Sequence, residues 1–406
     1  MAGFSAADAR TGWTERLNSR PLLILFLVSL AGCYGAMSVA VLPALIDTWV
    51  VYLHIPESTA GLIASCNVLG ATVSLALGTW LVSRMRLATI MALGFAIAAS
   101  GDAASMLARD AAVLLPIRFL CGFGLGLIVA ATMNWIGRHA QADRGFGFYM
   151  TLQFVFTAIL FALIPWLGPV AGNAAVYIAL LMLACCTLVL LPVLLRADGG
   201  EKLPTQAAQS GQAANGASYA PLAATLIIVS LVLFELAAIG VWTYMLRYGE
   251  VTGLSAAQAS QVLSLCSLCG IPGGVLVVVL GSRYGRLIPI IAALGLFIAV
   301  LAVFSVRLVT PVVFIIGTAL QNIAWNFVFP YLQGIQSALD GTGRLAIWGM
   351  LCASLGAAAG PALLGAMVEG QSYRSAFFAA AAILAGSLLA ALAPALLTDR
   401  LLPVRG

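Results

Sequence analysis

The sequence predicts an all-α integral membrane protein with twelve transmembrane helices, arranged as two pseudo-symmetric six-helix bundles. Of the 406 residues, 62% are hydrophobic and only 8% are charged, and the mean hydropathy is +1.07. Soluble domains carry roughly a quarter of charged residues, so this composition excludes a soluble protein. A short basic turn between long apolar runs occurs at 82–87 and again at 281–287, which indicates that one six-helix unit is repeated.

The apolar runs are long enough for twelve membrane crossings, because a helix needs about 20 apolar residues to span a hydrocarbon core about 30 Å thick. The runs place the spans at 21–46, 58–82, 87–107, 112–136, 145–167, 173–195, 221–246, 255–281, 287–306, 310–334, 343–367 and 374–396. The predicted organisation is an N-terminal tail at 1–20, a bundle at 21–195, a linker at 196–220, a second bundle at 221–396 and a C-terminal tail at 397–406. The linker is rich in Gly, Ala, Gln and Ser and is expected to be a flexible tether.

The distribution of Lys and Arg predicts the orientation, because these residues are retained on the cytoplasmic side. With the N-terminus inside, fourteen of them are cytoplasmic and only four, Arg109, Arg247, Arg307 and Arg374, lie outside. Both termini and the linker are therefore expected in the cytoplasm. The first 20 residues contain no apolar core and are not expected to be a cleaved signal peptide. Scarce Lys and abundant Ala and Gly suit a bacterial inner-membrane protein.

Three charged side chains fall inside predicted spans, where ionisation costs at least ~2.5 kcal/mol. Asp102 and Arg118 lie eight residues on either side of the turn at Asp110, so they are expected at similar depth and could pair. For Asp102, a structural ion pair or a position near the headgroups stands beside a role in proton coupling. For Arg118 we favour a functional role, as a coupling residue or an anion contact, over structural packing.

Glu235 is the strongest candidate for a proton carrier. It lies near the middle of the seventh span, with no cation within a helical turn. Burial without a cationic partner disfavours the charged form of a carboxyl, so this side chain can bind and release a proton. The alternative is a neutral Glu that forms a hydrogen bond with a neighbouring helix.

Further polar and aromatic residues gather on spans that would line a central cavity. Trp242 follows Glu235 by seven residues, which places both on one helical face. On the tenth span, Gln321 and Trp325 form one pair four residues apart, and Asn322 and Asn326 form another. The predicted substrate contacts are Tyr34, Arg118, Trp242, Gln321, Asn322, Trp325 and Asn326. The alternative for the tenth-span residues is hydrogen bonding between helices.

The two basic turns and the fourth span resemble motifs of the major facilitator superfamily, a family of secondary transporters. Its loop motif runs roughly G-x-L-a-D-R-x-G-R, and the run Leu280-Gly281-Ser282-Arg283-Tyr284-Gly285-Arg286 resembles it except for Ser282 at the acidic position. The first copy, Gly78-Thr79-Trp80-Leu81-Val82-Ser83-Arg84-Met85-Arg86, departs further, with Val82 at that position.

The resemblance implies that Arg84, Arg86, Arg283, Gly285 and Arg286 act in conformational switching. In the family the acidic residue latches one conformation across the two halves, so here the latch would be weakened or made by other residues. The run Arg118-Phe119-Leu120-Cys121-Gly122-Phe123-Gly124 resembles a family element that is linked to proton coupling.

One motif is missing from its usual place. Exporters of the drug/proton antiporter type carry G-x-x-x-G-P-x-x-G-G in the fifth span, and 145–167 lacks it. A related run, Gly356-Ala357-Ala358-Ala359-Gly360-Pro361-Ala362-Leu363-Leu364-Gly365, lies in the eleventh span. We interpret that run as close helix packing through small residues.

Together these features predict a proton-coupled secondary active transporter of a small organic solute, amphipathic or carboxylate-bearing, that works by alternating access. Uptake by symport is favoured; a proton-antiporting exporter of drugs or apolar metabolites is the alternative, and a sensor or enzyme on the same scaffold is a remote one. We expect no enzymatic activity. The partners would be the solute, protons and the lipid bilayer, with no nucleic acid, and the protein would be a monomer. The eight cysteines lie in apolar spans and His54 and His139 in predicted loops, so no metal site and no cofactor is expected.

Overall fold

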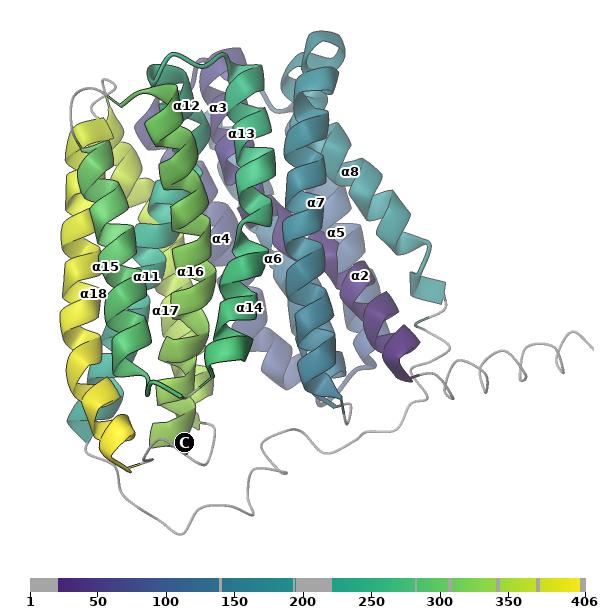
Figure 1. Cartoon of the computed structure of the whole chain (residues 1–406). Helices are drawn as coiled ribbons and strands as arrows, with labels where there is room; N and C mark the ends of the chain where they lie inside the picture. Colours follow the sequence, from purple (N-terminus) through teal and green to yellow (C-terminus); the bar gives the residue numbers. More distant parts are fainter. Residues whose placement is uncertain are drawn as a thin grey trace, which may run out of the picture.

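Figure 1 shows the computed structural model, which describes residues 21–138, 141–192, 194, 221–281, 283–305, 309–340, 344–369 and 373–401. Within these ranges the chain is almost entirely helical. The predicted N-terminal tail at 1–20 and the linker at 196–220 lie outside the described residues, as do the last residues of the predicted C-terminal tail, 402–406.

The first half of the chain forms six spans. In chain order its helices are α2 (Pro21–Ala40), α3 (Leu42–Leu53), α4 (Glu57–Leu81), α5 (Leu87–Leu107), α6 (Ala111–Gly137), α7 (Ala142–Ala171), the 3₁₀ turn η1 (Gly172–Ala174) and α8 (Ala175–Leu188). The pair α2 and α3 makes one span with a break at Val41. Pro43 lies in the first turn of α3, where its missing N–H leaves no helical hydrogen bond unfilled.

The second half repeats this plan. Its helices are α11 (Pro221–Thr243), α12 (Met245–Val251), α13 (Ala256–Leu268), α14 (Gly270–Leu280), α15 (Leu287–Phe304), α16 (Pro311–Leu339), α17 (Arg344–Val368) and α18 (Tyr373–Leu401). A capping box opens α13, because Ser255 Oγ accepts from the N–H of Gln258 and the Gln258 side chain accepts from the N–H of Ser255.

Eleven apolar helical stretches of the described chain are long enough to cross a membrane. One of them, Arg144–Leu188, has 45 residues, about twice the length that one crossing needs. It covers nearly all of α7 and the whole of α8, and the chain reverses between them at Gly172, whose φ of 55° is one that glycine tolerates. The described residues therefore form a multi-pass integral membrane protein whose twelve-helix architecture agrees with the sequence prediction.

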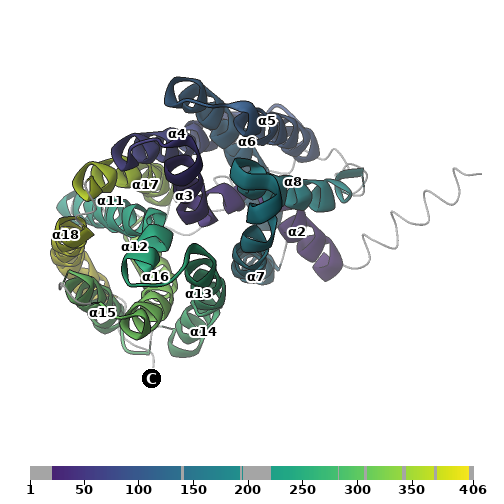
Figure 2. The ribbon, with the colours of Figure 1, turned by 90° about the horizontal axis from the view of Figure 1, so that it is seen from above.

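The two halves match in sequence spacing. The helices α2, α5 and α6 begin at residues 21, 87 and 111, and α11, α15 and α16 begin at 221, 287 and 311, so a shift of 200 residues aligns them. The first span of each half is broken, at Val41 and at Tyr244. Seen along the bundle axis in Figure 2, α2–α8 form one group and α11–α18 the other.

Glycines set the closest helix contacts. A Cβ atom at Gly356 would overlap the carbonyl oxygen of Val232, and one at Gly360 would overlap that of Leu236, so α17 packs directly on the backbone of α11. This confirms the interpretation of the eleventh-span glycines as packing residues.

The contacts between the halves are unevenly distributed along the bundle. The start of α2, the start of α11 and the end of α18 lie at one end of the bundle, the lower end in Figure 1. Towards the other end, here called the distal end, Ser260 and Ser264 of α13 donate to carbonyls of Phe161 and Ala158 in α7, each at 2.7 Å. The α4–α17 seam is also closed there, where the N–H of Ala362 donates to the Ser65 hydroxyl at 3.0 Å.

Candidate functional site

A fully buried ion pair joins the third and fourth spans. Asp110 caps α6 by accepting from the N–H of Val113 at 3.0 Å, and the tight turn brings α5 and α6 side by side. Arg118 Nη1 lies 2.7 Å from Asp102 Oδ1, and both side chains are 0% exposed. The pairing predicted from their equal separation from Asp110 is therefore confirmed.

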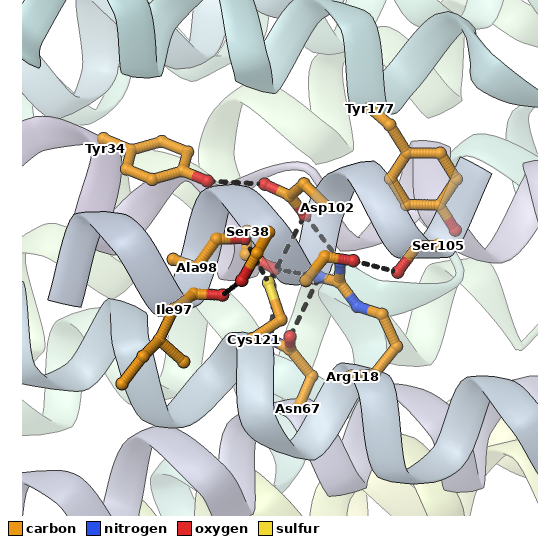
Figure 3. A network of polar contacts seen from close by, with 12 residues as sticks. Tyr34, Ser38, Asn67, Ile97, Ala98, Asp102, Ser105, Arg118, Cys121 and Tyr177 are labelled. Carbon is orange, nitrogen blue, oxygen red and sulfur yellow. Dashed lines mark hydrogen bonds and ion pairs between the residues drawn. The ribbon is translucent and has the colours of Figure 1, made fainter. Parts of the chain in front are cut away.

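Side chains from two other spans complete this network, which Figure 3 shows. The Tyr34 hydroxyl donates to Asp102 Oδ2 at 2.7 Å. Arg118 Nη2 donates to Ser38 Oγ at 2.6 Å and to Asn67 Oδ1 at 2.9 Å. Asn67 Nδ2 in turn donates to Ser38 Oγ at 3.0 Å. These bonds offset the desolvation of the two charges, because a buried ion pair is tolerated only when its remaining hydrogen-bonding capacity is filled.

The network satisfies Arg118 from inside the N-terminal half. Its guanidinium carbon lies 5.9 Å from the centre of the Tyr177 ring, and the Tyr177 hydroxyl accepts from Trp49 Nε1 at 2.7 Å. Among the atoms of the Arg118 guanidinium, Nε is the one left without a hydrogen-bond partner in the described chain. Arg118 therefore does not present a free cation to the interface between the halves.

Glu235 is an isolated buried carboxyl in α11. It is 8% exposed, and its Oε1 atom has no hydrogen-bond partner among the described residues. On the same face, Trp242 donates from Nε1 to the carbonyl of Ala40 at 2.9 Å and meets the ring of Phe161 edge-on at 6.0 Å. Both partners belong to the N-terminal half, so Glu235 and Trp242 lie on the face of α11 that is turned towards that half.

The structure divides the polar residues predicted on the tenth span, all of which lie on α16. Asn326 Nδ2 donates to the carbonyl of Gly270 at 2.5 Å, at the break between α13 and α14, and Asn322 donates to a carbonyl one turn earlier in its own helix. Gln321 Oε1 and Trp325 Nε1 are buried without a partner among the described residues. Two amides are thus bound to backbone, whereas Gln321 and Trp325 keep unfilled hydrogen-bonding capacity.

A ladder of aromatic rings connects α16 to α11. The Phe329 ring stacks on Trp325 with centroids 5.8 Å apart and an interplanar angle of 6°. It also stacks on Phe234, the residue before Glu235, at 6.4 Å and 24°. The rings therefore join α16 to α11 through Phe234, the residue that precedes Glu235 in sequence.

A second ion cluster, the distal cluster of Asp47, Glu57, Arg247 and Glu250, joins the halves at the distal end. Arg247 Nη1 lies 3.4 Å from Asp47 Oδ1 and 3.2 Å from Glu250 Oε2, and its Nε lies 3.3 Å from Glu57 Oε1. The Tyr373 hydroxyl donates to the same Glu57 oxygen at 3.1 Å. Asp47 and Glu57 belong to the N-terminal half and the others to the C-terminal half, so this cluster closes the distal end.

The distal cluster carries three carboxyls against one guanidinium. Burial, and then the repulsion of Asp47, raise the pKa of Glu250, while the attraction of Arg247 opposes this shift. The cluster therefore holds more negative charge than its cation balances, and it gains by binding a proton.

The two basic turns, at the end opposite the distal cluster, are stabilised differently. In the second turn, the Asp399 carboxylate of α18 accepts from the N–H of Arg286 at 2.8 Å and from that of Leu287 at 3.0 Å, and Gly285 takes a positive φ of 69°. In the first turn, the Arg84 guanidinium lies 4.5 Å from the centre of the Trp80 ring. Ser282, at the acidic position of the motif, lies outside the described residues; the carboxylate at this turn comes from Asp399.

Several residues of these clusters were not predicted from the sequence. Ser38 and Asn67 are single polar residues on apolar spans, and only tertiary packing brings them to Arg118. Asp47, Glu57 and Arg247 fall near predicted loops on one side of the membrane, and their opposite charges were the available signal. The proton-coupling and substrate-binding roles assigned to individual residues stay predictions.

The fold defines a class of protein, a bundle of twelve membrane-spanning helices in two repeated halves. The sequence model of the Major Facilitator Superfamily matches residues 22–343, and the chain belongs to that family. No curated protein matches the sequence.

Solved structures with the same fold bind chemically different solutes. The chain is similar to a mutant of the nucleoside transporter NupG, with a TM-score of 0.70 and 14% identity, over 92% of this chain and 100% of that one. It is similar to a mutant of the peptide transporter POT, with a TM-score of 0.71 and 18% identity over 94% and 95%. A D-xylose-proton symporter gives 0.70 and 17% over 94% and 98%. At these identities the likeness shows the fold, and a fold hosts many substrates.

Proposed function

We propose that the protein is a proton-coupled secondary transporter of a small organic solute, with Glu235 as the proton carrier. The observation that carries this proposal is the buried Glu235 carboxyl on the face of α11 that is turned towards the other half, whose Oε1 atom has no hydrogen-bond partner among the described residues. A carboxyl inside a membrane protein with no cation beside it marks an ion or proton pathway. One of the similar structures is a D-xylose-proton symporter, which supports the proton as the coupling ion.

Alternating access is supported by the uneven contacts between the halves. The distal cluster, the α7–α13 serines and the α4–α17 seam join the halves at the distal end. With both termini in the cytoplasm of a bacterial inner membrane, as the distribution of Lys and Arg favours, the distal end faces outwards. Transport would then require these contacts to break while the opposite end closes.

The Asp102–Arg118 pair is the second element of this proposal. Its contacts support a coupling or positioning role over direct solute binding, because Arg118 is already held by Asp102, Ser38 and Asn67. The pair fixes the depth of α2, α4, α5 and α6 relative to one another. A change in Tyr34 or Asp102 would therefore reach the broken first span, since Ser38 lies three residues before its break at Val41.

Uptake by symport is the first direction to test, and export by proton exchange is the second. Uptake was expected for a carboxylate-bearing solute, and such a solute would find no unpaired cation among the described spans, because Arg118 is engaged and the other described cations lie near helix ends. Export gains support because its expected solutes, drugs or apolar metabolites, need no such cation.

The proposal is tested in proteoliposomes with an imposed pH gradient. A compound that raises the unfolding temperature of the purified protein is used as the transported probe. The wild type should accumulate it, and the sign of the gradient that drives accumulation gives the direction. Glu235→Gln should abolish driven accumulation and keep exchange without a gradient. Driven accumulation of wild-type size and pH dependence in Glu235→Gln would show that the proton site lies elsewhere.

A further inference from the structure

Some side chains at the contact between the halves have a hydrogen-bond partner in each half. The Thr72 hydroxyl of α4 lies 2.9 Å from the carbonyl oxygen of Val68 in its own helix and 3.3 Å from that of Ser354 in α17. The Thr72 side chain is buried. Its hydroxyl therefore has two acceptors for one proton, one on each side of the contact.

Tyr244, at the break between α11 and α12, is placed in the same way. Its hydroxyl lies 3.0 Å from the carbonyl oxygen of Pro361 in its own half and 3.2 Å from that of Glu57 in the other half. The Tyr244 side chain is fully buried. The hydroxyl can thus keep one acceptor if the other moves away.

Arg247, three residues after Tyr244, repeats this arrangement with charges. Its guanidinium lies 3.2 Å from Glu250 Oε2 in its own half. Across the contact it lies 3.3 Å from Glu57 Oε1 and 3.4 Å from Asp47 Oδ1. For Thr72, Tyr244 and Arg247 alike, the contact within the half is the shorter one, which favours it when only one of the two can be kept.

The short helix α12 has a further attachment to its own half. The Tyr248 hydroxyl donates to the carbonyl of Phe304 in α15 at 2.8 Å. The Tyr248 ring also meets the ring of Phe377 in α18 edge-on, with centroids 4.6 Å apart. Tyr248 therefore joins α12, which carries Arg247, to the C-terminal half.

These double partners decide what happens to the polar groups when the halves separate. A buried polar group that loses its only partner keeps unfilled hydrogen-bonding capacity, which raises the cost of separation. A group with a second partner in its own half avoids this loss. The hydroxyls of Ser260 and Ser264 differ, because their described hydrogen bonds lead only to the other half.

We propose that Thr72, Tyr244 and Arg247 are exchange points between the halves. When the halves separate, each gives up its longer contact with the other half and keeps the shorter one within its own half. Tyr244 and Arg247 accordingly move with the C-terminal half, and α12 does not stay behind with the N-terminal half. This inference rests on the proposed opening of the distal end, and it names side chains that keep the cost of that opening low.

Two glycines contact the Tyr244 hydroxyl from opposite halves and provide a test. A Cβ atom at Gly61 in α4 would overlap the Tyr244 hydroxyl and the Pro361 carbonyl oxygen, which both belong to the other half. A Cβ atom at Gly365 in α17 would overlap the same hydroxyl from within the C-terminal half. If Tyr244 moves with its own half, Gly61→Ala hinders only the closed form, whereas Gly365→Ala hinders both forms.

The ratio of open to closed protein is measured with spin labels on Leu107→Cys and Val312→Cys, in lipid nanodiscs and in a background without native cysteines. These exposed residues lie at the end of α5 and in the first turn of α16, in opposite halves and outside α12. Gly61→Ala should raise the ratio at least about fivefold, because opening relieves the overpacking. Gly365→Ala should lower the unfolding temperature and change the ratio by less than about twofold, since its overlap persists in both forms.

Tyr244→Phe removes the hydroxyl and keeps the ring. It should leave the ratio within about twofold of the wild type, because the hydroxyl has a partner in both forms. Combined with Gly365→Ala, it should restore most of the unfolding temperature that Gly365→Ala loses, because it removes the overlapping atom. Ser264→Ala is the matched control, since its hydroxyl bonds only across the contact, and it should raise the ratio about fivefold.

The outcomes separate this inference from the proposed function. If Gly365→Ala raises the ratio as much as Gly61→Ala, Tyr244 stays with the N-terminal half and the inference is overturned. Equal ratios in Tyr244→Phe and Ser264→Ala overturn it as well. In both cases an open population is present, and alternating access stands. A single closed population in the wild type and in every variant overturns the inference together with alternating access, whereas the role of Glu235 is decided separately by driven accumulation.

Discussion

The two halves share a plan of helices but place their charges in opposite ways. At positions related by the shift of 200 residues, Asp102 and Arg118 correspond to Ala302 and Thr318, and Tyr34 corresponds to Phe234. The N-terminal half therefore has a paired polar core, and the C-terminal half has an aromatic core at the same depth. Glu235, in contrast, is a charged residue of the C-terminal half that corresponds to Gly35 in the N-terminal half. The repeat supplies the scaffold, and a few unmatched substitutions give each half its own chemistry.

The largest expected effect is the loss of the paired core. Arg118→Ala should lower the free energy of unfolding by about 3–5 kcal/mol, because it leaves the Asp102 carboxylate buried without its cation. The matched change in the other half, Thr318→Ala, should cost far less, since Thr318 Oγ1 has no hydrogen-bond partner among the described residues. Denaturant titration of both variants in detergent, followed by tryptophan fluorescence, measures the difference. Equal losses would mean that Arg118 contributes no more to stability than the residue at the matched position of the other half.

The double variant Asp102→Asn with Arg118→Gln sharpens this result. It removes both charges and keeps groups that can form hydrogen bonds, so stability should recover relative to Arg118→Ala. If transport recovers with stability, the pair is structural. If the protein folds but does not transport, Arg118 acts in coupling.

The next effect concerns the contact between the halves. Arg247→Ala removes the single cation of the distal cluster and leaves Asp47, Glu57 and Glu250 to repel one another, so the distal end should open. Spin labels on cysteines at the exposed positions Tyr52 and Val251, in a background without native cysteines, should show a larger mean separation. An unchanged distance distribution would show that the serine contacts between α7 and α13 and the α4–α17 seam hold the distal end closed without the cluster.

A smaller effect should appear as a dependence on pH. The pKa of Glu250 is raised in the closed cluster, so the closed form binds a proton more readily than an open form in which this carboxyl is solvated. Closure is therefore favoured as the pH falls through the interval between the raised and the ordinary pKa of Glu, and it is weakened as the pH rises. Glu250→Gln should reduce this dependence, measured with the same pair of labels. The same slope in both proteins would assign the titration to another group.

The smallest expected effect separates the two basic turns. Asp399→Ala should cost about 0.5–2 kcal/mol, because the N–H groups of Arg286 and Leu287 lose their acceptor at the start of α15. Hydrogen exchange should accelerate in the first turn of α15 and stay unchanged in the first turn of α5, which Asp399 does not contact. Acceleration in both turns would indicate that the turns are coupled through the bundle.

The sequence predicted the fold better than the sites, for a physical reason. Length, hydropathy and repeated turns are local properties, and they sufficed for twelve helices in two halves. The Asp102–Arg118 pair could also be predicted from the sequence, because both residues lie eight positions from the same tight turn. The hydrogen bond from Tyr34 to Asp102 was not predicted, because it depends on how α2 rotates against α5. Asn67 and Ser38 depend on the rotation of α4 and α2 in the same way, and the distal cluster depends on which ends of the halves meet.

The break at Cys269 divides the eighth span into two short rods with different attachments. The first helix, α13, forms hydrogen bonds with α7 through Ser260 and Ser264. The second helix, α14, packs mainly against α16 and begins at Gly270, whose carbonyl accepts from Asn326. The span can therefore bend at this break, so that the eleven residues of α14 move without the rest of the span. Movement of α14 can therefore change the end with the basic turns while the serine contacts between α13 and α7 stay in place.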